Sequence, residues 1–299
     1  MSGAAADRLA IDYYRPDPRL APYVSGYHCY RLRLAPGERH ADLFFPGWTN
    51  LRFSLAAEPW GVRLGRRDFA PVPRAALFGP TSHAGYVEAG SGALVGAGLT
   101  PLGWARLFGR DASAFADRIE PLDRLLGDDA GALAGRLEAG ETPSAVFDAF
   151  FAARLAARAP EPPELARLLA AIADPDIASV GALRAAVGLP PRTLNRISRS
   201  GLGFTPKLLL RRARFMRALI AALGLERGRW AEAIVPAGYF DQSHFLRDCR
   251  LFLGMPLGRF AALPKPLAER SLRLRDFALG APVQALHRLS EAPPAAGQL

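Results

Sequence analysis

Two stretches of the chain, centred 50 residues apart, share one pattern: a short apolar helix, a glycine-containing turn and a second helix. The first turn is Val187-Gly188-Leu189 and the second is Ala237-Gly238-Tyr239. Glycine readily adopts the positive φ of a sharp turn, which lets the second helix of each stretch cross the first. Each stretch therefore predicts a helix-turn-helix unit.

A long helix is expected between the two units. Thr205 suits the N-cap position and Pro206 the first helical position, which predicts a helix over residues 206–223. At 1.5 Å per residue such a helix spans roughly 27 Å, and successive major-groove faces of DNA lie ~34 Å apart. The long helix is thus expected to act as a rigid spacer that presents two recognition helices to one face of DNA.

The positive charge is concentrated in the same region. Residues 176–267 contain 13 Arg and 2 Lys against 5 acidic residues, whereas residues 1–175 contain 19 Arg against 20 acidic residues. A strongly basic segment beside a neutral one indicates a polyanion-binding module attached to a second domain. The alternative is a solvated, arginine-rich surface.

The fold class predicted is α+β. Residues 8–100 contain short strand-like runs between Pro and Gly breaks, typical of antiparallel β structure, over residues 23–34, 49–55, 61–69, 75–80, 85–90 and 92–99. Helical spacing begins near Pro101 and includes the run over residues 119–140. The division expected is a β-rich sensor domain (1–125), a helical connector (126–163), a DNA-binding domain (164–267) and a C-terminal tail (268–299). The tail is expected to hold one helix around Leu272–Leu279 before a disordered end.

Several classes of protein are disfavoured. No uninterrupted run of ~18 apolar residues predicts a membrane span, and the N-terminus does not resemble a secretory signal. Two cysteines, Cys29 and Cys249, cannot form a disulfide scaffold or a CxxC site. Phosphate-loop, dinucleotide-binding and nucleophile-elbow motifs are absent from the sequence. We therefore expect a cytoplasmic protein that is not an enzyme, without catalytic residues, metal or cofactor.

The basic segment resembles the DNA-binding domain of AraC/XylS-type transcriptional regulators over roughly residues 165–264. The signature is Gly238-Tyr239-Phe240-Asp241-Gln242-Ser243-His244-Phe245-Leu246-Arg247, then Gly254, Pro256 and Phe260, with Leu194, Arg196, Gly203, Thr205, Pro206, Arg214 and Ala218 in the first unit. Residues 14–140 resemble a sensor-type domain found in some such regulators. The resemblance implies sequence-specific binding to promoter DNA and activation or repression in response to a small-molecule effector or another signal, with RNA polymerase as a candidate further partner.

The sequence departs from the family pattern at five positions. Arg184 and Ile234 replace a small residue four positions before each turn glycine, and Ser198 and Cys249 replace an aromatic residue in the recognition helices. Pro236 lies in the last turn before Gly238, where proline distorts a helix. These changes bear on how the helices of each unit pack.

Candidate DNA contacts lie on the exposed faces of the second helix of each unit, where side chains reach base edges. In the first unit they are Arg192, Thr193, Asn195 and Arg196, with Arg199, Lys207, Arg211 and Arg212 suited to phosphates. In the second unit they are Gln242, Ser243, Leu246 and Arg247, with Arg250 on the backbone and His244 in a structural or phosphate-binding role. The expected cores are Leu183, Val187, Leu194, Ile197, Ala233, Tyr239 and Phe245.

Other interpretations remain open at this point. A metal-dependent enzyme in the β domain, with secondary DNA binding, would draw on His28, Cys29, Glu38, His40 and His83, although no ligand motif relates them. A nonspecific basic binder would bind all duplexes alike. Most of the aromatic residues are expected in the core rather than around a ligand: Tyr27, Tyr30, Trp48, Phe53, Trp60 and Tyr86. The amphipathic helix expected over 143–158 is a candidate surface for a homodimer.

Overall fold

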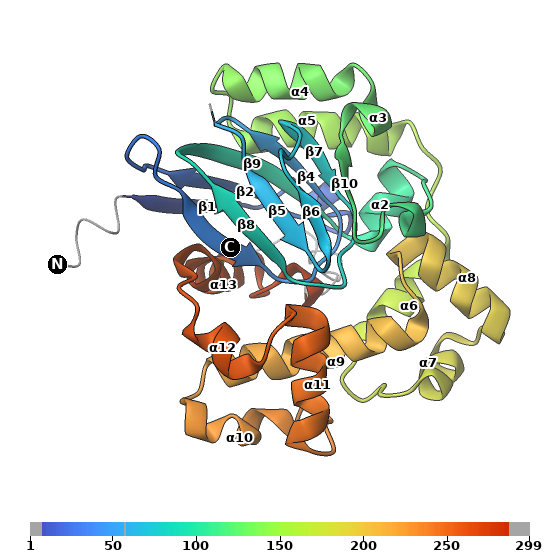
Figure 1. Ribbon diagram of the computed structural model, residues 1–299. Helices are drawn as coiled ribbons and strands as arrows, with labels where there is room; N and C mark the ends of the chain where they lie inside the picture. The colour runs from blue at the N-terminus through green and yellow to red at the C-terminus, as the bar shows by residue number, and fades with distance from the viewer. Residues whose placement is uncertain (1–7, 57, 287–299) are drawn as a thin grey trace, which may run out of the picture.

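The computed structural model describes residues 8–56 and 58–286. Its N-terminal part is a sandwich of two antiparallel sheets, with helices on its outer faces and a helical region beside it (Figure 1). The six-stranded sheet has the order β1 (Leu9–Tyr14), β2 (Val24–Leu32), β9 (Gly92–Leu99), β4 (Asn50–Ser54), β7 (Ala75–Phe78) and β10 (Ile119–Pro121). The four-stranded sheet has the order β3 (His40–Phe44), β8 (Gly85–Ala89), β5 (Gly61–Leu64) and β6 (Arg67–Phe69).

The α+β fold class is confirmed. Each strand-like run of residues 8–100 forms a strand, and the run over residues 61–69 forms the hairpin β5–β6. Three strands were missed: β1, β3 and β10. For β10 the helical expectation at residues 119–121 is wrong, because Ile119 pairs with Phe78 at the edge of the sheet. Tertiary pairing overrides the local helical pattern here.

Helices cover the outer face of the six-stranded sheet. They are α2 (Pro101–Leu107), α3 (Asp123–Leu126), α4 (Asp129–Glu138) and α5 (Pro143–Ala156). Strand alternation places Leu51 and Phe53 of β4 in the core beneath these helices. Phe147 and Phe151 of α5 are fully buried in that core. The apolar face on which the dimer prediction rests is thus occupied inside the chain.

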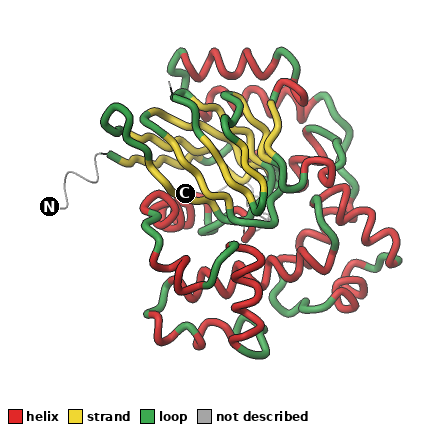
Figure 2. The backbone as a smooth tube through the Cα atoms, in the orientation of Figure 1, coloured by secondary structure: helices red, strands yellow, loops and turns green. Residues whose placement is uncertain are grey.

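The C-terminal part is helical (Figure 2). It comprises α6 (Pro163–Ala173), α7 (Val180–Val187), α8 (Pro191–Leu202), α9 (Pro206–Leu223), α10 (Ala231–Ile234), α11 (Gln242–Leu253) and α12 (Leu257–Ala262). The predicted long helix is α9, with Thr205 as its N-cap and Pro206 in its first turn. It contacts α6, α7 and α8 on one side and α10 and α11 on the other, so it connects the two units.

The chain then returns to the β sandwich. Helix α13 (Pro266–Leu279) packs against β1 and β3, and the 3-10 turn η4 (Gln284–Leu286) contacts α9. The Asp42 carboxylate accepts hydrogen bonds from the backbone N–H groups of Leu267 and Ala268 and so holds the first turn of α13. The boundary expected between the DNA-binding domain and the C-terminal tail, at residue 268, falls inside α13, which contains the helix expected around Leu272–Leu279. The expected disordered end of the tail lies outside the described residues.

The sandwich and the helical region share hydrophobic clusters. Leu43 and Ala84 pack with α9–α12, and Trp48 and Leu102 pack with α6–α9. Among the described helices none is long and apolar enough to cross a membrane.

Candidate nucleic-acid interface

The first helix-turn-helix unit is formed by α7 and α8. Gly188 ends α7 in the left-handed conformation, with φ of 67°, as the turn requires. Leu183, Val187 and Leu194 are at most 4% exposed and form the predicted core, whereas Ile197 is only partly buried. Arg184, where the family has a small residue, is exposed and does not enter the helix contact.

The second unit is formed by α10 and α11. Its first helix is only four residues long and ends before Pro236, and Gly238 has φ of 85°. Asp241 caps α11 by accepting a hydrogen bond from the backbone N–H of His244 at 2.6 Å. Ala233, Tyr239 and Phe245 form the predicted core. The buried Ile234, Ser198 and Cys249 show that the substituted positions remain packing positions.

The two recognition helices carry equivalent surface stripes. On α8 the stripe consists of Arg192, Asn195, Arg196 and Arg199, all exposed, and on α11 it consists of Ser243, Leu246, Arg247 and Arg250. In both sets the later members follow the first by 3, 4 and 7 positions (offsets 0, 3, 4 and 7), and this spacing places all four side chains on one face of a helix. Leu246 is half-buried against the core, and the other three members of its stripe are exposed. We refer to these two sets as the recognition stripes.

The remaining predicted contacts flank the stripes. Gln242 is exposed at the start of α11, Thr193 is half-buried, and Lys207 is exposed at the start of α9. His244 is half-buried; its ring meets that of Tyr239 edge-on, with centroids 5.1 Å apart, and its Nε2 lies 3.4 Å from Arg214 Nη2. Phe240, which belongs to the signature but was not predicted as a DNA contact, is 94% exposed immediately before Asp241.

Arg211 is engaged within the protein. Its guanidinium pairs with Asp248, whose side chain is fully buried in α11, and Tyr239 donates a hydrogen bond to the other carboxylate oxygen at 2.6 Å. The sole acid inside α11 is therefore neutralised internally, and α8 contains no acidic residue. Both recognition stripes thus present positive charge without a competing carboxylate on the same helix.

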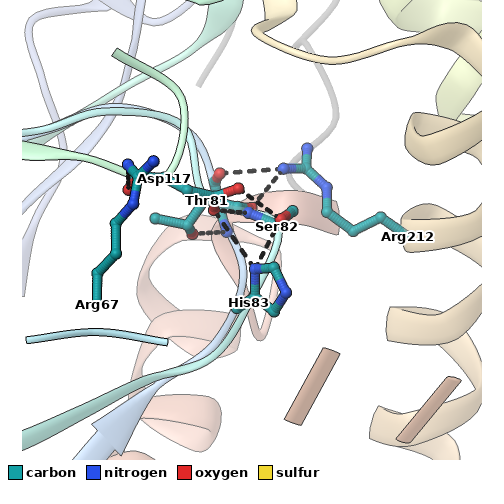
Figure 3. Close-up of polar contacts among 7 residues, drawn as sticks. Arg67, Thr81, Ser82, His83, Asp117 and Arg212 are labelled. Atoms are coloured by element: carbon teal, nitrogen blue, oxygen red, sulfur yellow. Dashed lines mark hydrogen bonds and ion pairs between the residues drawn. The ribbon is translucent and has the colours of Figure 1, made fainter. Parts of the chain in front are cut away.

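The phosphate contact expected for Arg212 is wrong for this structure. Arg212 is 2% exposed; its Nη1 donates hydrogen bonds to the carbonyl oxygens of Thr81 at 2.8 Å and Gly47 at 3.2 Å (Figure 3). Its guanidinium also stacks 4.0 Å from the ring of Trp48. Successive helical residues are separated by 100°, so Arg211 faces the second unit while Arg212 faces the sandwich.

The loop that receives Arg212 is itself fixed. Ser82 donates a hydrogen bond through its backbone N–H and another through its hydroxyl to the Asp117 carboxylate, at 2.6 and 2.7 Å. His83 lies 3.7 Å from the same carboxylate, and Arg67 donates a hydrogen bond to the Asp117 carbonyl oxygen (Figure 3). Burial raises the pKa of Asp117, but the interactions of its carboxylate with His83 and Ser82 outweigh burial and lower the pKa below its usual value. Helix α9 therefore docks on a preorganised loop.

The residues considered for a metal site are dispersed. Glu38 pairs with Arg8, His40 with Asp42 and His83 with Asp117, while His28 and Cys29 lie on adjacent positions of β2. Among the described residues no group of three or more His, Cys, Asp or Glu side chains could hold a metal ion.

A cavity of about 180 Å³ lies between the two sheets. Of the aromatic residues considered above, Tyr30, Trp48 and Trp60 line it, whereas Tyr27 and Phe53 lie in the core under α5. Tyr86 instead donates a hydrogen bond to the Leu253 carbonyl oxygen at the end of α11. Trp48 and Trp60 are also buried members of hydrophobic clusters, so the expectation that core packing accounts for most of these rings is confirmed.

Two helix-turn-helix units joined by one long helix define a DNA-binding transcription regulator. Residues 183–262 match the family model described as "Helix-turn-helix domain", so the chain carries the AraC-type DNA-binding domain predicted from its sequence. Comparison with curated proteins gave no match.

Two solved structures resemble the chain over most of its length. ToxT from Vibrio cholerae O395 has a TM-score of 0.42 and 8% identity, and the alignment covers 86% of this chain and 98% of ToxT. An apo lysine-to-alanine variant of ToxT from Vibrio cholerae strain SCE256 has a TM-score of 0.43 and 8% identity, with 85% and 97% covered.

Proposed function

We propose that the protein regulates promoters by sequence-specific DNA binding, and that a small molecule bound in its β sandwich controls this binding. The observation that carries the first part is the pair of recognition stripes, which repeat the same four offsets on two helices held by α9. Arginine can pair bidentately with guanine and asparagine with adenine, so Arg192, Asn195 and Arg247 are proposed to read bases.

The remaining contacts are proposed to position the protein on the backbone. Arg199, Lys207 and Arg250 are exposed at the margins of the stripes, where a long cation reaches phosphate oxygens without reading sequence. Arg211 would have to leave Asp248 to do the same.

Effector control is supported by the way the two parts are joined. Gly47, Trp48 and Thr81 line the cavity, and all three also contact Arg212 of α9. A ligand that moves these residues would change the position of α9, the helix that joins the two units, on the β sandwich. Cavity and DNA interface are thereby linked through one guanidinium.

Fluorescence anisotropy with DNA from immediately upstream of the protein's own gene, and a shuffled duplex as control, tests DNA recognition. Specific regulators prefer their sites by ~10³ or more. A preference of that order for the native fragment is the expected result, whereas equal, salt-sensitive binding to both duplexes at every salt concentration would indicate a nonspecific binder. The homodimer remains a prediction, which the mass of the protein with and without DNA checks.

A further inference from the structure

The cavity between the sheets is lined by two buried arginine side chains, one from the β sandwich and one from the C-terminal helix α13. Arg52 comes from β4 and Arg275 from α13; they are 9% and 7% exposed and both line the cavity. Neither guanidinium has a hydrogen bond or an ion pair with another residue of the described ranges 8–56 and 58–286; Arg52 Nε and Arg275 Nη2 are buried without a partner. An uncompensated buried charge is costly, and buried cations are ordinarily paired.

The Arg52 guanidinium packs against two aromatic rings. Its guanidinium carbon lies 4.5 Å from the ring centre of Phe44 and 4.2 Å from that of Phe78. The two ring centres are 5.8 Å apart, so the rings contact the guanidinium from directions roughly at right angles, and neither ring supplies a hydrogen-bond acceptor for its N–H groups. Burial lowers the pKa of Arg52 to about 10, so the group is still a cation at neutral pH.

Further polar groups without partners surround the two guanidiniums. His28 Nε2 and Trp60 Nε1 are buried in the cavity wall and have no partner among the described residues. Burial first, and then the charges of Arg52 and Arg275, lower the pKa of His28 well below its usual value, so its ring is neutral. The cavity wall therefore contains several buried polar nitrogen atoms that have no hydrogen-bond partner among the described residues.

The acid in the cavity wall does not satisfy them. The Asp42 carboxylate accepts hydrogen bonds from Leu43, Leu267 and Ala268 and lies 3.1 Å from His40 Nε2. It forms no ion pair with either arginine among the described residues. The nearby phenols of Tyr13 and Tyr30 hydrogen-bond to each other, and Tyr13 also to Ser271 of α13.

We propose that this cavity is a site for a small organic anion, whose carboxylate or phosphate group is bound by Arg52 and Arg275. Apolar and aromatic side chains also line the cavity, among them Phe44, Trp60, Phe78 and Leu94. A 150 Å³ apolar cavity holds a benzene molecule, so about 180 Å³ suits an acid of single-ring size. This inference rests on the proposed function by naming the chemistry of its effector.

Helix α13 makes the site dependent on the DNA-binding region. Four residues of α13 line the cavity: Leu267, Ala268, Ser271 and Arg275. Three residues separate α13 from α12, the helix that follows the recognition helix α11. An anion bound by both Arg52 of β4 and Arg275 of α13 would hold α13 against the sandwich. Because α13 follows α10–α12 in the chain, the position of the second unit would be restricted as well. The ligand thereby stabilises one placement of α11 relative to α8.

Calorimetric titration of the full chain with phenylacetate, phenyl phosphate and neutral 2-phenylethanol tests the site. At least one anion is expected to bind tenfold or more tightly than the alcohol, and the tighter anion identifies a carboxylate or a phosphate ligand. Weaker binding of both anions, or equal binding of the alcohol, overturns the proposal.

Substitutions separate ligand binding from a structural role. R275M and R52M are each expected to lower the affinity for the anion at least tenfold and to leave the affinity for the alcohol unchanged. The melting temperature of the unliganded protein should be unchanged or higher, because a buried unpaired charge has been removed. R273M, on the exposed face of the same helix, should match the wild type. R275K, which keeps the charge but not the planar fork, should bind the anion with intermediate affinity.

A lowered melting temperature with unchanged anion affinity in both methionine variants would assign the arginines a structural role and overturn the proposal. A DNA titration of the unliganded protein tests the proposed DNA-binding function separately from the proposed class of ligand. Specific DNA binding without anion binding contradicts only the ligand class, and anion binding without specific DNA binding contradicts only the proposed function.

Discussion

Arg211 of the long helix α9 donates a hydrogen bond from Nε to the Asp248 carboxylate of recognition helix α11 at 2.6 Å. Asp248 is fully buried, and Tyr239 of the turn donates to its second oxygen. The spacer helix α9 therefore meets the turn and the recognition helix of the second unit at one carboxylate. This polar contact adds to the stacking of Phe215 of α9 on Phe245 and Phe252 of α11.

Replacing Asp248 with asparagine should destabilise the protein. Removing one partner of a buried ion pair costs ~3–5 kcal/mol, but Arg211 keeps 35% of its side-chain exposure and can turn to solvent, so we expect about 2–3 kcal/mol. Urea denaturation measures the change. D176N, at an exposed acid before α7, is the matched control and should unfold as the wild type does.

The recognition stripes should lose specificity when one member is shortened. N195A or R247A is expected to weaken binding to the native promoter fragment by about 1–3 kcal/mol and to leave binding to the shuffled duplex nearly unchanged. Anisotropy titrations with both duplexes measure this. K207M, by contrast, should weaken binding to both duplexes and reduce the salt slope by roughly 0.9. The same loss on both duplexes for N195A would show that Asn195 does not read a base.

R212M should loosen the junction between α9 and the sandwich. The Thr81 carbonyl oxygen loses its Arg212 donor, whereas the Gly47 carbonyl oxygen keeps the Thr81 backbone N–H at 3.0 Å. One unsatisfied buried carbonyl costs about 1–3 kcal/mol, which should appear as faster proteolysis between residues 158 and 163 and a lower unfolding free energy. R217M, farther along the same helix, should leave the cleavage rate nearly unchanged. Identical digestion of R212M and wild type would contradict the role of Arg212 at this junction.

Cys249 should make stability fall at high pH. Burial, and secondarily the Asp248 charge, raises the pKa of its thiol to about 12. The folded state thus holds the thiol proton after the unfolded chain has released it, so the free energy of unfolding decreases as pH rises from about 9 toward 12. C249A should show a shallower decline over that window in chemical denaturation. Unchanged slopes would mean that Cys249 does not titrate differently on folding.

The double unit was predictable because its signals are local. A glycine at each turn, Thr205-Pro206 at a helix start and the 0, 3, 4, 7 spacing of the recognition stripes depend only on neighbouring backbone geometry. The strands were largely predictable for the same reason. Strand β10 was missed because its pairing with β7 depends on residues about 40 positions away, not on local pattern.

The sequence by itself determined the two units, their spacer and the positive charge they carry, since each follows from local spacing and composition. Only the tertiary structure decided what neighbouring arginines do: Arg211 meets Asp248, while Arg212 enters the sandwich. It also decided that Arg52 and Arg275, 223 positions apart in the sequence, share one cavity. The physical reason is that burial and pairing of a charge depend on contacts between distant segments, which local spacing does not encode.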